Sequence, residues 1–255
     1  MKKITIQHIK NLKSLKTSFP TITAYDYMSA KIVDEAEIPL ILVGDSASMM
    51  IYGYDTTIPI SMEEILLLTK AVSRGSKRSL IVADMPFLSY QPSIEETIKN
   101  AGKLMKEGGA AAVKLEGGVR IKQNVYALVE HGIPVLGHVG LTPQSYHQMS
   151  GYKVQGKNNQ EAKQIINDAR ALEEAGAFGI VLECIPEALA EKITNTLTIP
   201  TIGIGSGKKC DGQIQVFHDI LGYSPNKSPK HAMQYDSLYS NVLKSVKKYK
   251  SDIES

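Results

Sequence analysis

The sequence has few cysteines and no long apolar segment. Its 255 residues include two cysteines, Cys184 and Cys210, and neither stands in a C-x-x-C pair. This argues against a zinc ribbon, a dithiol redox motif and a disulfide scaffold. No stretch approaches the ~20 apolar residues of a transmembrane helix. The run from Ile4 to Ile9 is interrupted by polar residues, so the apolar region of an export signal is missing. These absences predict a cytoplasmic protein without a membrane partner.

Excess charge is also small. The formal net charge is +3, which is too weak to favour nucleic acid as a partner, so small molecules are the expected partners. No low-complexity linker divides the chain, and its 255 residues are close to the roughly 250 of one (β/α)8 barrel. We expect a single barrel domain over residues 1–255, with an N-terminal helix at roughly 5–16 and a C-terminal helical tail at roughly 235–253.

Short apolar runs alternate with helical patterns along the chain. Such runs, bounded by Gly or Pro, are typical of buried strands. They predict strands at 21–25, 111–115, 134–139, 178–182 and 201–204, and two more that end at Asp45 and Asp84. The eighth element, at 213–217, is either a strand or a helix. This alternation implies a parallel sheet, and about seven repeats favour a closed TIM barrel. The lack of G-x-G-x-x-G after the first strand weakens a Rossmann interpretation.

Three carboxylates stand at or next to the ends of these runs: Asp45, Asp84 and Glu116. Because all strands of a parallel barrel end at one rim, these groups are expected to gather there. Their oxygens suit Mg²⁺, which keeps several waters and leaves positions for a substrate. A 2-oxo acid would chelate such a metal, which would stabilise its enolate as a Lewis acid. For any one of these residues the alternative is a helix cap or a loop position.

Other polar residues share these strand ends: Asp26, Lys114, His138 and Glu183. Lys114 precedes Glu116 by two residues, so both side chains should lie on the same side of the strand. A lysine buried among acids there would occupy a functional position. Glu183 is a candidate proton acceptor or the partner of a neighbouring cation. His138 would bind metal or a substrate oxygen, or would be a hydrogen-bonded structural histidine.

A glycine-rich segment, Gly203 to Gly207, follows the predicted seventh strand. At this position in a barrel it would hold a phosphate or another anion. Tight packing at a turn explains the glycines equally well.

Eight segments, in order across nearly the whole chain, resemble the ketopantoate hydroxymethyltransferase family. They are TAYDYMSAKI (23–32), ILVGDS (41–46), IVADMPFLSY (81–90), AVKLEGG (112–118), GIPVLGHVGLTPQS (132–145), GYKVQGK (151–157), ALEEAGAFGIVLE (171–183) and IPTIGIGSGKKCDGQ (199–213). Eight ordered segments make the resemblance far more specific than a single motif.

The resemblance implies a (β/α)8 barrel of the phosphoenolpyruvate/pyruvate type that binds Mg²⁺. It implies transfer of a hydroxymethyl group from 5,10-methylenetetrahydrofolate to 3-methyl-2-oxobutanoate, which forms 2-dehydropantoate in pantothenate synthesis. It also implies a homo-oligomer, commonly a decamer. By motif, the metal ligands are Asp45, Asp84 and, directly or through water, Glu116. Contacts to the oxo acid come from Asp45, Ser46, Asp84 and Lys114, and Glu183 is the proton acceptor.

The chain departs from the family pattern at Ala47-Ser48, at Leu67-Leu68 and at Ser150. None of these is a metal, base or lysine position, so the departures concern loop shape or the folate pocket. A competing interpretation is a carbon–carbon lyase of the same barrel type, because Lys208-Lys209-Cys210 echoes a lyase K-K-C-G-H loop without its Gly-His ending. Another is a non-catalytic barrel used for binding, against which the intact set of acids argues.

Overall fold

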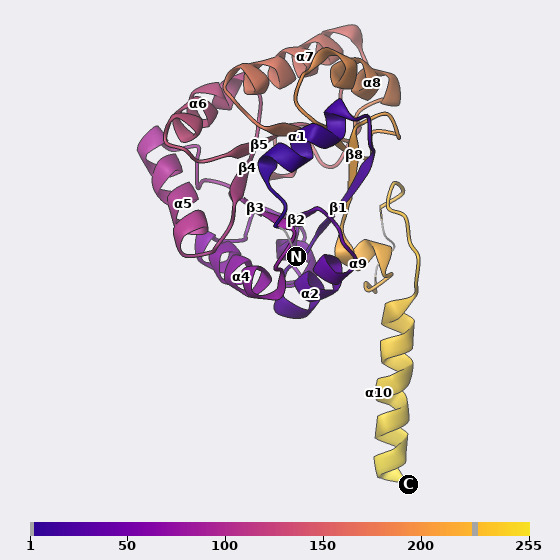
Figure 1. The fold of residues 1–255 in the computed structure, drawn as a ribbon. Helices are drawn as coiled ribbons and strands as arrows, with labels where there is room; N and C mark the ends of the chain where they lie inside the picture. Colours follow the sequence, from indigo (N-terminus) through magenta and orange to yellow (C-terminus); the bar gives the residue numbers. More distant parts are fainter. Residues whose placement is uncertain (1–2, 226–228) are drawn as a thin grey trace.

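Eight parallel strands form a closed barrel in which strand order follows the sequence (Figure 1). The computed structural model describes residues 3–225 and 229–255. The strands are β1 (Phe19–Thr23), β2 (Leu40–Val43), β3 (Leu80–Asp84), β4 (Ala112–Glu116), β5 (Val135–Gly140), β6 (Gly179–Glu183), β7 (Thr201–Ile204) and β8 (Gly212–Gln215). The predicted TIM barrel is confirmed.

Helices surround this sheet, as Figure 1 shows, and the last helix projects away from it. The α-helices are α1 (Ile6–Ser14), α2 (Tyr27–Glu35), α3 (Ala47–Met50), α4 (Met62–Gly75), α5 (Ile94–Lys106), α6 (Lys122–Glu130), α7 (Asn159–Glu174), α8 (Glu187–Thr196), α9 (Phe217–Ile220) and α10 (Leu238–Glu254). Two 3₁₀ turns, η1 (Val119–Ile121) and η2 (Pro143–Ser145), lie in the loops after β4 and β5. Within the described ranges, no helix has the length and apolarity needed to cross a bilayer.

The eighth element is a strand followed by a helix. Residues Gly212–Gln215 pair with β1 on one side and with β7 on the other, which closes the barrel. The backbone N–H of Phe217 then donates to the hydroxyl of Thr23, and Phe217 begins α9. Of the two structures predicted for residues 213–217, the strand is therefore confirmed as far as Gln215, and a helix begins at Phe217.

The two terminal helices begin and end near their predicted positions. α1 ends at Ser14 rather than at residue 16, because Lys16 has a φ of 53°, which an α-helix cannot contain. α10 begins at Leu238 rather than at residue 235, because Ser237, with φ −126° and ψ 52°, does not have helical backbone angles.

Strand side chains alternate between the barrel interior and the surrounding helices. In β3, Leu80 and Val82 belong to an inner apolar cluster, whereas Ile81 and Ala83 pack in the larger cluster that includes the helices. This is the period of two that a strand imposes. The parity continues to the strand end, so Asp84 shares the inward side with Leu80 and Val82.

Helix α1 closes the N-terminal end of the barrel. Its Ile9 is fully buried and joins the same inner cluster as Phe19 and Leu40, which begin β1 and β2. Thr5 caps the helix, since its hydroxyl accepts a hydrogen bond from the backbone N–H of His8. Apolar packing thus fills this end and leaves the opposite rim for polar groups.

The Asp34 carboxylate ties α2 to the segment that leads into β3. It accepts hydrogen bonds from the backbone N–H groups of Lys77, Arg78 and Ser79, and from the hydroxyls of Ser76 and Ser79. Burial of the carboxylate would raise the pKa of Asp34, but these hydrogen bonds outweigh burial and lower the pKa below its ordinary value.

We predict that Asp34→Ala lowers the free energy of unfolding by about 1–2 kcal/mol, because several charge-assisted hydrogen bonds of a partly buried group are lost. Since the pKa is lowered by folding, the difference from wild type should be complete above about pH 4 and shrink at lower pH. Urea unfolding at several pH values measures both. The control Glu35→Ala removes an exposed pair with Lys31 and should change stability by less than about 0.5 kcal/mol. Equal effects of the two substitutions would contradict the assignment.

Candidate active site

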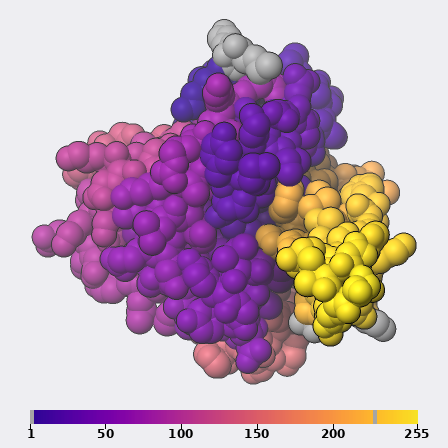
Figure 2. Space-filling view, turned by 90° about the horizontal axis from the view of Figure 1, so that it is seen from below, coloured from indigo at the N-terminus to yellow at the C-terminus, as the bar shows by residue number. Residues whose placement is uncertain are grey.

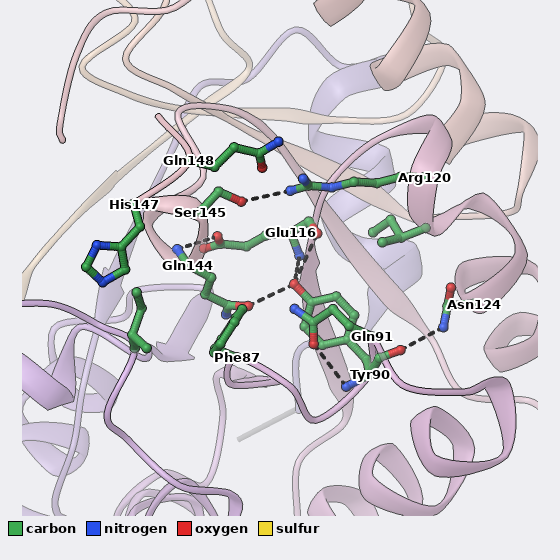
Figure 3. A pocket seen from close by; sticks show the side chains of 12 residues that line it. Phe87, Tyr90, Gln91, Glu116, Arg120, Asn124, Gln144, Ser145, His147 and Gln148 are labelled. Carbon is green, nitrogen blue, oxygen red and sulfur yellow. Dashed lines mark hydrogen bonds between the residues drawn. The ribbon is translucent and has the colours of Figure 1, made fainter. Parts of the chain in front are cut away.

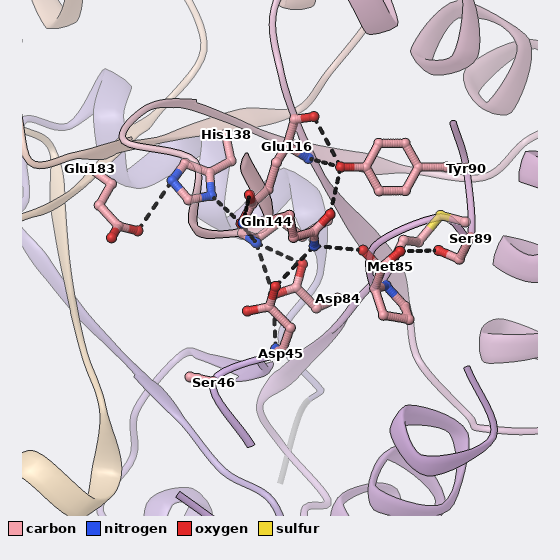
Figure 4. A network of polar contacts seen from close by, with 12 residues as sticks. Asp45, Ser46, Asp84, Met85, Ser89, Tyr90, Glu116, His138, Gln144 and Glu183 are labelled. Carbon is pink, nitrogen blue, oxygen red and sulfur yellow. Dashed lines mark hydrogen bonds and ion pairs between the residues drawn. The ribbon is translucent and has the colours of Figure 1, made fainter. Parts of the chain in front are cut away.

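The predicted site residues meet in one cavity at the C-terminal rim of the barrel (Figure 4). Asp45 lies two residues beyond the end of β2, and Asp84, Glu116 and Glu183 are the last residues of β3, β4 and β6. His138 lies within β5. This rim cavity has a volume of about 380 Å³, and its lining includes Asp45, Ser46, Asp84, Lys114, Glu116, His138 and Glu183. The structure therefore brings together all seven residues, which come from four successive strands, β3 to β6, and the loop after β2.

Register and alternation explain why these side chains converge. Lys114 is the lateral neighbour of Asp84 in the β3–β4 pairing, and Glu116 is the neighbour of His138 in the β4–β5 pairing. Lys114 and Glu116 follow Ala112 of the inner cluster at intervals of two residues, so both point inward. The strand register therefore places acids and cations side by side.

Lys114 is a buried cation held by two carboxylates. Its Nζ donates to Asp84 Oδ1 and Oδ2 at 2.6 and 2.8 Å and to Glu116 Oε1 at 3.3 Å. Burial disfavours the charged amine, but the charges of Asp84, Glu116 and Asp45 outweigh it and raise the pKa of Lys114 above its ordinary value. Lys114 is therefore an ammonium ion with all three donors occupied.

The carboxylates differ in how well their charge is compensated. Burial would raise the pKa of Glu116, but Lys114 and His138 lower it to about 2. For Asp45, burial and the charges of Asp84 and Glu116 raise the pKa well above its ordinary value. Asp45 accepts from the side-chain amide of Gln144 through Oδ2, whereas Oδ1 accepts no hydrogen bond from any residue that the structure describes. Asp45 is thus the carboxylate whose ionised form a further cation would stabilise most.

His138 stands between two carboxylates. Its Nδ1 lies 3.3 Å from Glu116 Oε1 and its Nε2 lies 3.2 Å from Glu183 Oε2, both at ion-pair distance but without the alignment of a hydrogen bond. Burial favours the neutral ring, yet the charge of Glu116 raises the pKa of His138 to about 9. A charged imidazolium therefore connects the interior acids to Glu183, which is the more exposed carboxylate at the cavity edge.

Ser46 lies at the entrance to α3 and is held by a buried tyrosine. The hydroxyl of Tyr25 is 2.8 Å from that of Ser46, and Tyr25 is fully buried. The Ser46 side chain makes no capping hydrogen bond to α3. Its hydroxyl therefore faces the rim cavity rather than serving the helix.

The donor set fits Mg²⁺ shared with a substrate. Among residues 3–225 and 229–255, no three His, Cys, Asp or Glu side chains form a cluster that would hold a metal ion by itself. Mg²⁺ is usually bound through only one or two carboxylates, with waters and substrate oxygens completing its octahedron. The oxygens of Asp45 and Asp84, and the uncompensated charge of Asp45, meet that requirement.

Two other residues or segments singled out from the sequence have structural roles. Asp26 caps α2, since its Oδ1 accepts from the backbone N–H groups of Met28 and Ser29. The Gly203–Gly207 segment forms a tight turn, because a Cβ on Gly207 would lie 2.4 Å from the Glu187 side chain. Glu187 also accepts from the backbone N–H of Lys208, so a carboxylate already occupies a donor that an anion would use. These contacts favour a tight turn over an anion site.

The Cys210 thiol does not belong to the rim cavity. Cys210 is buried in the large core cluster, and burial raises its pKa. The neighbouring Asp211 pairs with Lys13 of α1 at 2.9 Å. The Lys208–Cys210 segment therefore lacks the exposed cysteine that the lyase alternative requires.

Two buried residues of the site escaped the sequence analysis: Gln144 in η2 and Tyr90 after β3. Both line a second cavity of about 520 Å³ that shares Glu116 with the rim cavity (Figure 3). Each lies within a segment that resembles the family, but no spacing or strand-end position marks it. The signal that was available is composition, since a glutamine next to a proline in a buried loop needs partners.

Solved structures with the same architecture support the fold. A phosphonopyruvate hydrolase crystallised with oxalate and Mg²⁺ has a TM-score of 0.64 and 14% sequence identity. The match covers 86% of this chain and 81% of the hydrolase chain. A 2,3-dimethylmalate lyase of the PEP mutase/isocitrate lyase superfamily has a TM-score of 0.60 and 17% identity, with coverage of 82% and 79%. At this level of identity the likeness concerns the fold alone, and it agrees with the closed (β/α)8 barrel.

Sequence relatives are much closer. The 3-methyl-2-oxobutanoate hydroxymethyltransferase of Carboxydothermus hydrogenoformans is 52% identical over 254 residues, which is 100% of this chain and 92% of the relative. The enzyme of the same name from Clostridium beijerinckii is 51% identical over 253 residues, which is 99% of this chain and 92% of the relative. The family model described as ketopantoate hydroxymethyltransferase matches residues 3–255. The chain therefore belongs to the ketopantoate hydroxymethyltransferase family of enzymes.

Proposed function

We propose that this protein transfers a hydroxymethyl group from 5,10-methylenetetrahydrofolate to 3-methyl-2-oxobutanoate, forming 2-dehydropantoate for pantothenate synthesis in the cytoplasm. One water supplies the hydroxyl oxygen, and tetrahydrofolate is released. The observation that carries the proposal is the single cavity that joins Asp45, Asp84 and Lys114 to Glu183. Its relatives, about half identical over the full chain, bear the name of this activity.

Mg²⁺ is the metal that the donor set suits. Asp45 and Asp84 would hold it, and Glu116 would complete its surroundings directly or through water. When bound, the ion would act as a Lewis acid on the 2-oxo acid. Asp45 is the carboxylate that needs this cation most, because burial and its acidic neighbours raise its pKa.

The protein's own groups divide the remaining work. Lys114 lies in the cavity wall as an ammonium ion and stabilises negative charge that develops on the keto oxygen, without reorganisation during the reaction. Ser46, whose hydroxyl contacts Tyr25, and His138 contribute polar contacts to the substrate. Glu183, at the cavity edge, removes the proton from C3, so that C3 becomes the nucleophile that bonds to the methylene carbon. Both bonds from that carbon to folate nitrogens break, water supplies its hydroxyl group, and tetrahydrofolate leaves with the two nitrogens protonated.

A test of the whole activity is an assay with 3-methyl-2-oxobutanoate, methylenetetrahydrofolate and Mg²⁺. We expect 2-dehydropantoate, identified by mass spectrometry, only when all three are present. EDTA should abolish product formation, and added Mg²⁺ should restore it. Product formed without the folate, or full activity in EDTA, would contradict the proposed reaction.

A second test isolates the base. Glu183→Gln should reduce deuterium exchange at C3 of 3-methyl-2-oxobutanoate by at least 10²-fold, as expected when a positioned base is removed, while Mg²⁺ binding persists. NMR of the oxo acid in D₂O with Mg²⁺ measures the exchange without the folate. Glu191→Gln is the matched control, because Glu191 pairs with Lys209 on the exposed side of α8. Wild-type exchange in Glu183→Gln would rule out the assigned role.

We also propose that the protein is a homo-oligomer, with a decamer as the expected size. Helix α10 has no buried residue, and Figure 2 shows the yellow C-terminal segment standing out on the surface. An apolar stripe runs along it at alternating spacings of three and four residues. The stripe consists of Tyr239, Val242, Val246, Tyr249 and Ile253, each between 38% and 70% exposed. Such a seam is typical of a helix that packs on another chain, and we propose a second copy as that chain.

Light scattering coupled to size-exclusion chromatography tests this arrangement. The wild type should have the mass of an oligomer, and Val246→Lys should shift it toward smaller species by placing a charge in the apolar stripe. Ser251→Lys adds the same charge on the opposite face of α10 and should leave the mass unchanged. A monomeric wild type would contradict the proposal.

A further inference from the structure

The Gln144 side chain bridges parts of the site that come from different strands (Figure 4). Its Nε2 donates to Asp45 Oδ2 and to the backbone carbonyl of Met85, both at 2.9 Å. Its own backbone N–H donates to Glu116 Oε2 at 3.0 Å. One residue of η2 therefore holds an oxygen of each carboxylate that flanks Asp84. Only 4% of the Gln144 surface is exposed, so water does not compete strongly for these bonds.

Its partners dictate the orientation of the Gln144 amide. The carbonyl of Met85 can only accept a hydrogen bond, and an ionised Asp45 carboxylate also only accepts. Both must face the NH₂ group of Gln144. The opposite end, Oε1, lies 2.8 Å from the hydroxyl of Tyr90, which donates to it. Both N–H groups and the carbonyl oxygen of the amide then have partners, which only one orientation satisfies.

Tyr90 is itself fixed by the end of β4. Its hydroxyl oxygen accepts from the backbone N–H of Glu116 at 3.2 Å. Its single proton goes to Gln144 Oε1 at 2.8 Å, which is closer than the Glu116 carbonyl at 3.0 Å. Only 1% of Tyr90 is exposed. Tyr90 thus connects the backbone at the end of β4 to Gln144, and Gln144 connects to Asp45 beyond β2.

We infer that Gln144, oriented by Tyr90, is a positioning residue that sets the rotamer of Asp45 for a divalent cation. Because Oδ2 of Asp45 is held by the amide, Oδ1 is the oxygen left for the cation. The inference rests on the proposed function, since it assigns Asp45 to a metal. It goes beyond that function by assigning roles to two residues that do not touch the cation or the reacting atoms. Removing such outer partners typically lowers metal affinity 10–100-fold.

The experiment measures Mn²⁺ binding to the metal-free full-length protein, with free Mn²⁺ quantified by EPR. Gln144→Leu should raise the Mn²⁺ dissociation constant at least 10-fold, since Asp45 loses its partner while the backbone bond to Glu116 persists. Tyr90→Phe removes a single hydroxyl and should raise it several-fold, because Gln144 Oε1 then loses the partner that fixes its end of the amide and Asp45 Oδ2 is held less firmly. The control Gln148→Leu makes the same change at an exposed position of the neighbouring loop and should bind Mn²⁺ like wild type.

Thermal melting of the metal-free variants separates positioning from loop anchoring. A lowered melting temperature with unchanged Mn²⁺ affinity in both Gln144→Leu and Tyr90→Phe would overturn the inference, because the residues would then only anchor η2. If Gln144→Leu does not fold, the affinity of Tyr90→Phe decides alone. A wild type that binds no Mn²⁺ overturns the metal assignment and this inference together, whereas wild-type binding with unaffected variants overturns this inference alone.

Discussion

The site depends on one buried interaction, the ammonium of Lys114 against the carboxylate of Asp84. An isolated charge in the barrel interior would be strongly destabilising, and a buried pair is tolerated only with good geometry and further hydrogen bonds. Here Lys114 has all three donors engaged, and Asp84 Oδ2 also accepts from the backbone N–H of Asp45. The pair therefore anchors the other charges, since Glu116 owes its lowered pKa, against the effect of burial, first to Lys114.

Barrel geometry converts this pair into a site. The inner positions of β3 are apolar until the last, so that Leu80 and Val82 support Asp84 from below. In β4, Ala112 is apolar, and the next two inner positions, Lys114 and Glu116, are charged. The apolar layers exclude water from one side of the charged layer, which strengthens every electrostatic interaction within it. Loops then adjust what the strands supply: η2 brings Gln144 across the rim from β5 toward β2. The strands determine the positions of the charged groups, and the η2 loop determines how the Asp45 carboxylate is oriented.

The sequence predicted the strand-based part of this arrangement well. Asp84, Glu116 and Glu183 end their strands, and the two-residue spacing of Lys114 and Glu116 was sufficient to place both on one side. It did not predict Gln144 or Tyr90, because their partners are 99, 59, 54 and 26 residues away and depend on loop paths. Nor did strand-end position alone separate Asp26, a helix cap, from acids of the cavity. Local periodicity determines the direction of a strand side chain, but a loop side chain is directed only by contacts formed in the folded molecule.

Because α1 closes the N-terminal end of the barrel, the rim cavity is open only at the C-terminal rim. With Ile9 packed among Phe19 and Leu40 at the far end, whatever reaches the charged layer enters and leaves through the same mouth.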